Sequence, residues 1–192
     1  MKNRILNAAA LELNSRGTKF TMNSVASRLG ISKKTLYAHF PSKDAIIAGI
    51  FDVVLEDIAD QRQAILTSEM SLSERLTAIL TMKPRRLGKI NEAVLSDIRQ
   101  AYSEEWLKVQ KFHREQLAVI LDLLEQGKAA GEIRNVNSHV AAVILMSSVA
   151  QLLEQDFLAE QNLTISGALQ SLTDLFLNGV LNTAKSQYGG AA

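Results

Sequence analysis

The chain has 192 residues, of which 47% are hydrophobic and 21% are charged, and its formal net charge is +1. A chain of this length can bury a core of its own, and the composition excludes a disordered or collagen-like protein. The absence of cysteine excludes disulfides, thiolate metal ligands and cysteine nucleophiles. Only 2 prolines interrupt long stretches rich in Leu, Ala, Glu and Gln, so we predict an all-α protein.

The N-terminal segment lacks the continuous apolar core of a signal peptide, because Glu12, Asn14 and Arg16 interrupt its apolar residues. No later segment reaches the uncharged apolar length that a membrane span needs. We therefore expect a cytoplasmic protein with no membrane partner.

Charge is distributed unevenly along the chain. Residues 1–47 hold eight Lys or Arg against two Asp or Glu, a net charge of +6, which leaves −5 for the remaining residues out of the total of +1. Such an asymmetry between the two ends of a chain indicates a segment that meets a polyanion.

The first predicted helix covers residues 2–15, where apolar residues recur every three or four positions, and Gly17 ends it. Thr21 is placed to cap a short second helix over residues 22–29. Gly30 then terminates this second helix.

A third helix is predicted over residues 33–39, with Ser32 as its N-cap and Pro41 preventing its continuation. Two short helices joined by a few residues that include glycine are typical of a helix-turn-helix. At 100° per residue, Leu36 and Phe40 face inward from this third helix.

The opposite face of the third helix carries Lys34, Thr35 and Ala38, with Lys33 at its inner margin near the helix start. A lysine can reach guanine acceptors or phosphates, threonine offers a hydroxyl and a methyl, and alanine permits close approach. A solvated surface would explain the two lysines equally well, since each costs only about 0.3–1 kcal/mol against the helix dipole.

Amphipathic patterns predict six further helices. They cover residues 42–66, 72–82, 90–102, 104–129, 139–159 and 164–185. Asn137 or Ser138 is the expected cap of the fifth of these, Thr164 or Ser166 is the expected cap of the sixth, and the last residues form a frayed tail.

Three stretches of residues carry a resemblance to a known family. They are Gly17 with Thr21, then Val25-Ala-Ser-Arg-Leu-Gly-Ile-Ser32, then Thr35-Leu-Tyr-Ala-His-Phe-Pro-Ser-Lys-Asp-Ala-Ile46. This pattern resembles the DNA-binding domain of the TetR/AcrR family of bacterial transcriptional regulators. The resemblance implies an all-α homodimer in which an N-terminal three-helix helix-turn-helix domain, residues 1–47, binds DNA. A larger helical domain, residues 48–188, would bind a small-molecule effector and dimerise through the last two helices.

The resemblance also implies which residues contact DNA. Tyr37, His39 and Lys43 match family positions that clamp phosphates, whereas Ala38 replaces a bulkier residue of some members. The full set of expected DNA-binding residues is Thr21, Asn23, Lys33, Lys34, Thr35, Tyr37, His39 and Lys43. Lysines at helix N-termini are then explained by phosphates that meet both the ammonium groups and the exposed backbone N–H groups.

Aromatic residues with polar tips gather near the start of the helix predicted over residues 104–129. Tyr102, Trp106, Phe112 and His113 are the candidates for contacts to a largely apolar effector, although packing in a core would also explain each of them. No cofactor is implied, and no histidine has a second ligand at metal-binding spacing.

The leading hypothesis is a DNA-binding transcriptional regulator, a repressor that a small-molecule effector releases from a near-palindromic double-stranded operator. Its homodimer would form through the last two helices, whose apolar residues exceed what the interior needs. The alternative is a dimeric DNA-binding regulator that a protein partner or no effector controls. An enzyme is not expected, because no acid/base pair, nucleophile or metal site can be assembled.

Overall fold

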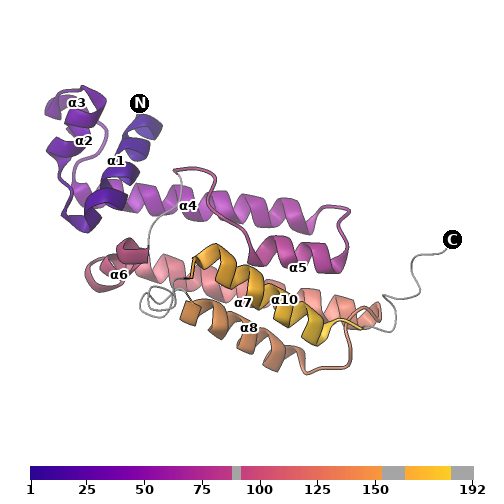
Figure 1. Cartoon of the computed structure of the whole chain (residues 1–192). Coiled ribbons are helices and arrows are strands. Elements are labelled where there is room, and N and C mark those ends of the chain that lie inside the picture. The colour runs from indigo at the N-terminus through magenta and orange to yellow at the C-terminus, as the bar shows by residue number, and fades with distance from the viewer. Residues whose placement is uncertain (88–91, 153–162, 183–192) are drawn as a thin grey trace. The chain divides into compact units, whose positions relative to one another are not determined.

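The structure, a computed structural model, describes residues 1–87, 92–152 and 163–182. In these ranges the regular secondary structure is helical, apart from an isolated bridge between Ile133 and Leu181. The all-α prediction is therefore confirmed. In chain order the helices of Figure 1 are α1 (Lys2–Arg16), the 3-10 helix η1 (Gly17–Lys19), α2 (Met22–Leu29), α3 (Lys33–Tyr37), α4 (Lys43–Leu66), α5 (Leu72–Leu80), α6 (Glu92–Ala101), α7 (Ser103–Ala129), α8 (Ser138–Leu152) and α10 (Ile165–Val180).

The chain packs as two compact units. The first unit combines Met1–Gln61 with Lys83–Gln110, and the second combines Arg62–Met82 with Lys111–Ala192. Because α4 and α7 cross these boundaries, each of the two helices contributes residues to both units. Packing thus groups the first three helices with much of α4. The division into a DNA-binding domain and an effector domain after residue 47 stays a prediction.

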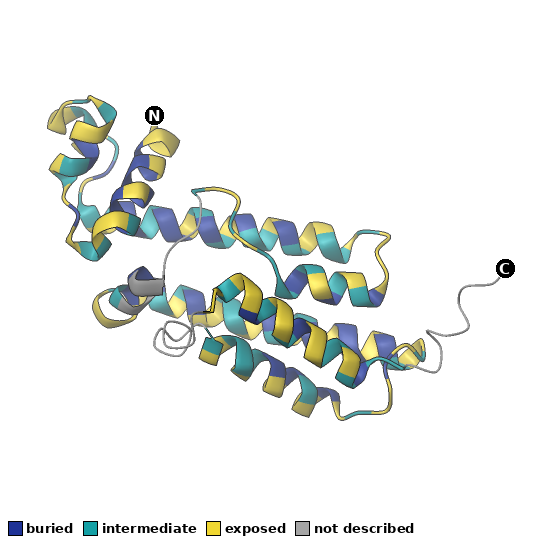
Figure 2. Ribbon diagram, in the orientation of Figure 1, coloured by how far each residue is buried: buried dark blue, intermediate teal, exposed yellow. Residues whose placement is uncertain are grey.

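The first unit is built around a core to which its short helices each supply a few large side chains. Burying one such side chain contributes about 1.5–3 kcal/mol, which holds α2 and α3 in place although neither is long enough to be stable alone. Figure 2 shows these positions in dark blue. Fully buried examples are Ile5 and Leu13 of α1, Val25 of α2, Leu36 of α3, and Ile46, Ile47 and Ile50 of α4.

The second unit has a separate core to which α5, α7, α8 and α10 contribute. α8 and α10 lie side by side, as Figure 1 shows. Leu76, Ile120 and Leu145 are fully buried in this core, and Val180 at the end of α10 is buried against them. Each unit therefore has the apolar interior that an independent fold requires.

The third helix is shorter than predicted. α3 ends at Tyr37, two residues before the expected end at His39. The carbonyl of Leu36 accepts from the N–H groups of both His39 and Phe40, at 3.0 Å each. This tight turn ends the helix before Pro41, since the residue that precedes a proline is itself disfavoured in the helical conformation.

The last helix also ends early, at Val180 rather than near residue 185. The chain beyond it is held in extended conformation by the segment that follows α7. Arg134 N–H donates to the carbonyl of Val180 at 2.9 Å, and Asn182 N–H donates to the carbonyl of Glu132 at 2.8 Å. Backbone partners outside the helix therefore replace the helical hydrogen bonds.

The remaining boundaries agree closely with prediction, although α5 ends at Leu80 instead of residue 82. Asn137 caps α8 by accepting from Val140 N–H at 3.1 Å, and Thr164 caps α10 by accepting from Gly167 N–H at 3.1 Å. Three predicted features lie outside the described residues. They are the start of a helix at residue 90, the end of α8 near residue 159 and the frayed tail.

Candidate nucleic-acid interface

The helix α2 is fixed at both ends by capping interactions. The Thr21 hydroxyl accepts from Ser24 N–H at 3.1 Å, and Thr21 N–H donates to the Ser24 hydroxyl at 3.2 Å, which together form a capping box. At the other end Gly30 adopts a left-handed conformation with φ 64°, which costs glycine nothing. The chain can therefore turn sharply from α2 into α3.

The helix α3 is oriented by one cap and one buried anchor. The Ser32 hydroxyl accepts from Thr35 N–H at 3.0 Å, and Leu36 is completely buried. Phe40, just beyond the helix, is also buried, so both predicted inward anchors are confirmed. The rest of the α3 surface is turned to solvent as a consequence.

The outward face of α3 presents the predicted basic residues. Lys33 and Lys34 are exposed and Thr35 is half-buried, while Ala38 just past the helix is exposed. Lys33 is the first residue of α3. Two ammonium groups beside a small residue suit a DNA groove.

Other predicted contacts differ in how free their side chains are. Asn23 is exposed and Tyr37 is 49% exposed, whereas His39 is half-buried. The Thr21 hydroxyl already serves as the α2 cap. Lys43 donates from Nζ to the carbonyl of Thr18 at 2.9 Å. The Lys43 ammonium group therefore already makes one hydrogen bond within the protein, in addition to any contact with a phosphate.

A buried carboxylate ties α1 to α2. Glu12 lies 2.6 Å from Arg28 Nη2 and 3.4 Å from Arg16 Nε, and its side chain is almost fully buried. Burial raises the pKa of Glu12, but hydrogen bonds from Ser24 and Arg28 and the charges of Arg16 and Arg28 outweigh it and lower the pKa below its usual range. The ionised carboxylate is thus part of the folded state.

Replacing Glu12 with Gln is expected to lower the free energy of unfolding at pH 7 by about 2 kcal/mol, because the arginines lose a charged acceptor. Since the folded pKa is depressed, this stabilisation is present above the unfolded value of about 4.3 and is lost as pH falls through the folded pKa. Urea unfolding at pH 7 and pH 3 measures it. Glu69→Gln, at an exposed residue, is the control, and an equal loss at both pH values would contradict the assignment.

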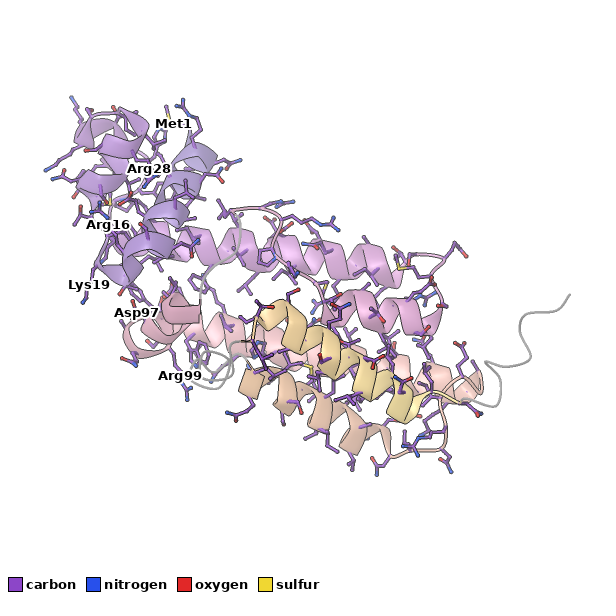
Figure 3. All side chains as sticks on the ribbon, in the orientation of Figure 1. Met1, Arg16, Lys19, Arg28, Asp97 and Arg99 are labelled. Carbon is purple, nitrogen blue, oxygen red and sulfur yellow. The ribbon has the colours of Figure 1, made fainter. Side chains whose placement is uncertain are left out.

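A second link joins η1 to α6. Asp97 Oδ2 accepts from both the N–H and the hydroxyl of Thr18, at 3.0 Å each. Gly17, with φ 60°, leaves room for this contact, because a Cβ there would lie 2.8 Å from the same oxygen. Figure 3 labels Asp97 of α6 and Lys19, the last residue of η1. Nothing in the sequence of α6 singles out Asp97, so sequence reasoning missed it.

The four candidate effector residues are divided between the two units. Tyr102 and Trp106 belong to the first unit and pack on its core, and Arg99 lies 5.7 Å from the Trp106 ring. Burial and the neighbouring Asp44 carboxylate, which accepts from the phenol, raise the pKa of Tyr102 to about 12. Tyr102 is therefore a neutral hydrogen-bond donor.

Phe112 and His113 belong to the second unit, where both are half-buried and their ring centroids are 6.3 Å apart. The guanidinium of Arg62 lies 5.4 Å from the Phe112 ring. Burial lowers the pKa of His113, so this imidazole is neutral at pH 7. An effector site at any of the four aromatic residues stays a prediction.

The described part of the chain consists of residues 1–87, 92–152 and 163–182. These residues contain no group of three or more His, Asp or Glu side chains placed to hold a metal ion. No helix among them is both long enough and apolar enough to cross a membrane.

The helices α1, α2 and α3 pack together, Gly30 makes the turn between α2 and α3, and α3 carries exposed basic residues. These features define a helix-turn-helix DNA-binding protein. Residues 5–50 match the family model described as bacterial regulatory proteins, tetR family. Residues 5–50 therefore form a DNA-binding domain of the TetR/AcrR family of transcriptional regulators, whose members bind DNA and are not enzymes.

Similar proteins span the whole chain. YvaF of Bacillus subtilis, an uncharacterized HTH-type transcriptional regulator, is 27% identical over 94% of this chain and 95% of its own. A transcriptional regulator from Saccharomonospora viridis, solved in complex with choline, has a TM-score of 0.77 and 20% identity over 94% and 97% of the two chains. SmeT, the repressor of the Stenotrophomonas maltophilia multidrug efflux pump SmeDEF, has a TM-score of 0.71 and 18% identity over 95% and 91%. These structures share the fold.

Proposed function

We propose that this regulator is a homodimeric repressor that binds a near-palindromic operator and leaves it when a small-molecule effector binds. The outward face of α3 carries the proposal, because Lys33, Lys34 and Thr35 are presented by a helix whose other face is anchored at Leu36. Of the proteins with this fold, SmeT is a repressor and the S. viridis regulator binds choline, which supports repression and a small-molecule effector. The protein would act in the cytoplasm.

The dimer is proposed to form through α8 and α10. Three apolar residues on α8 are more than half exposed, namely Val140, Val143 and Ile144, and Leu175 of α10 is 72% exposed. Figure 2 shows exposed residues in yellow along both helices. Exposed apolar residues that recur on adjacent helices are typical of a subunit interface. By contrast, Val180 is buried and Leu172 and Phe176 pack on the core, so these three residues stabilise the subunit itself.

A homodimer related by a twofold axis would set two copies of α3 about one DNA turn apart, which explains why the operator should be near-palindromic. Residues 1–47 would supply the DNA contacts, and the helices after residue 47 would supply the effector site and the dimer contact. Effector binding would favour a separation of the two copies of α3 that no longer fits successive grooves.

The DNA-binding face is tested by selecting bound duplexes from a random pool and measuring anisotropy across salt concentrations. Lys34→Ala should weaken binding to the selected duplex about ten-fold and relax its base preference, because an ammonium group on the outward face is lost. Lys111→Ala, which removes an exposed lysine from α7, is the matched control. Recovery of no enriched sequence, or equal losses in both variants, would contradict the proposal.

The effector is tested separately by thermal shift with a broad compound set. A compound that raises the melting temperature and lowers operator affinity would establish ligand-controlled release. If no compound in the set does both, the dimer is regulated by a protein partner or by its own abundance.

A further inference from the structure

The first unit contains a groove that the proposed regulation does not use. Its volume is ≈ 430 Å³, within the range of small-molecule sites, and it lies between the start of α1, the middle of α4 and the segment before α6. Leu6, Val53 and Leu87 supply apolar walls, and Asn3, Asn7 and Arg85 supply polar groups. Glu56 and Arg86, which pair with each other, complete the lining. An apolar floor with a few polar groups is typical of a binding site for a small organic molecule.

Buried groups of α4 hold one wall of this groove in place. The Asp57 carboxylate accepts from the backbone N–H groups of Arg85 at 2.5 Å and Arg86 at 2.9 Å. Gln61 Nε2 donates to the carbonyl of Lys83 at 3.0 Å. Both α4 side chains are buried, so the segment is fixed by hydrogen bonds that water does not compete for, and the two bonds to Asp57 are charge-assisted.

The wall ends at a strained residue. Leu87 has φ 62°. Among the residues that the structure describes, only Leu87 combines a side chain with a positive φ. A left-handed conformation costs a leucine about 1–2 kcal/mol, which the surrounding contacts must offset. Strain of this kind at a residue that lines a groove indicates that the position of its side chain matters.

The two arginines of this wall differ in whether their side chains form ion pairs. Arg86 lies 3.2 Å from Glu56 and 3.1 Å from Asp60, so its charge is neutralised by α4. Arg85 has no ion pair or side-chain hydrogen bond with any residue that the structure describes, and it lines the groove. A free guanidinium beside two side-chain amides suits a carboxylate, which it can bind through two parallel hydrogen bonds.

We propose that this groove binds a small organic carboxylate, with the carboxylate on Arg85 and a short apolar body over Leu6, Val53 and Leu87. The site lies in the unit that contains the helix-turn-helix, and it would contact α1 directly. It is therefore separate from an effector site at Phe112 or His113 in the second unit, and it does not depend on the proposed repression.

Titration of the isotope-labelled full-length protein with benzoate, followed by amide chemical shifts, tests the proposal without DNA. Millimolar benzoate should shift the amides of Asn3, Asn7, Val53 and Leu87, whereas benzamide and inorganic phosphate should not. Benzamide removes the charge and phosphate removes the apolar body. The same shifts with either compound, or no shifts with benzoate, would overturn the carboxylate site.

Two variants locate the carboxylate. Arg85→Gln should weaken benzoate binding about ten-fold, and Asn7→Asp should weaken it further by placing a like charge in the groove. Both side chains are exposed, so the fold should be retained, and Arg114→Gln on α7 is the matched control. Unchanged affinity in Arg85→Gln would overturn the assignment, while loss of operator binding in any variant would concern only the proposed function.

Discussion

Ile144→Glu is expected to convert the dimer into monomers and to lower affinity for the selected palindrome by at least about 100-fold, because two linked recognition helices become independent. Ile144 is 57% exposed on α8, so a glutamate there does not disturb the subunit core. In the proposed interface, however, the carboxylate would be buried opposite its own twofold copy without a partner. Sedimentation velocity and anisotropy on the same samples measure the two effects.

Leu107→Glu is the matched control for this experiment. Leu107 is 59% exposed on α7, in the first unit, and it lies outside the proposed interface. This variant should remain dimeric and bind the palindrome as the unmodified protein does. Affinity for a duplex with a single half-site should be similar in all three proteins. A monomeric unmodified protein, or dissociation by Leu107→Glu alone, would exclude the α8 and α10 interface.

Local sequence signals were sufficient for most of the helices. Caps such as Thr21 and Ser32, and stops such as Gly30, act within a few residues, so their geometry can be read from spacing alone. The early end of α10 was not predictable in this way. It depends on Glu132 and Arg134, which are distant in sequence from Val180 and supply backbone partners only after folding.

The candidate sites show the same division between local and distant information. The exposed face of α3 follows from the burial of Leu36, and helical periodicity predicts it. Asp97 could not be found from its own helix, because its role depends on Thr18, 79 residues earlier in the chain. Likewise, nothing in the adjacent Arg85 and Arg86 indicates that α4 neutralises only the second, which requires knowing where Glu56 and Asp60 lie.

Gly127, in the second unit, lies where the packing leaves no room for a larger side chain. Gly127 lies within α7, two residues before the helix ends. A Cβ at this position would lie 2.5 Å from Ile133 Cγ1 and would overlap Leu72 Cδ2. The carbonyl of Gly127 also accepts from Glu132 N–H and Ile133 N–H, at 2.8 and 3.0 Å, so the backbone cannot shift freely.

Gly127→Ala is therefore expected to lower the free energy of unfolding by about 2 kcal/mol, since overpacking outweighs the gain in helix propensity of about 1 kcal/mol. The melting temperature should fall by about 4–8 °C at constant protein concentration, measured by circular dichroism. Gly179→Ala in α10 is the matched control, because no atom lies within 4 Å of its added Cβ. At position 179 only helix propensity changes, so the stability of this variant should be unchanged or slightly higher. Equal stability of the two variants would show that α5 and Ile133 can move away from α7.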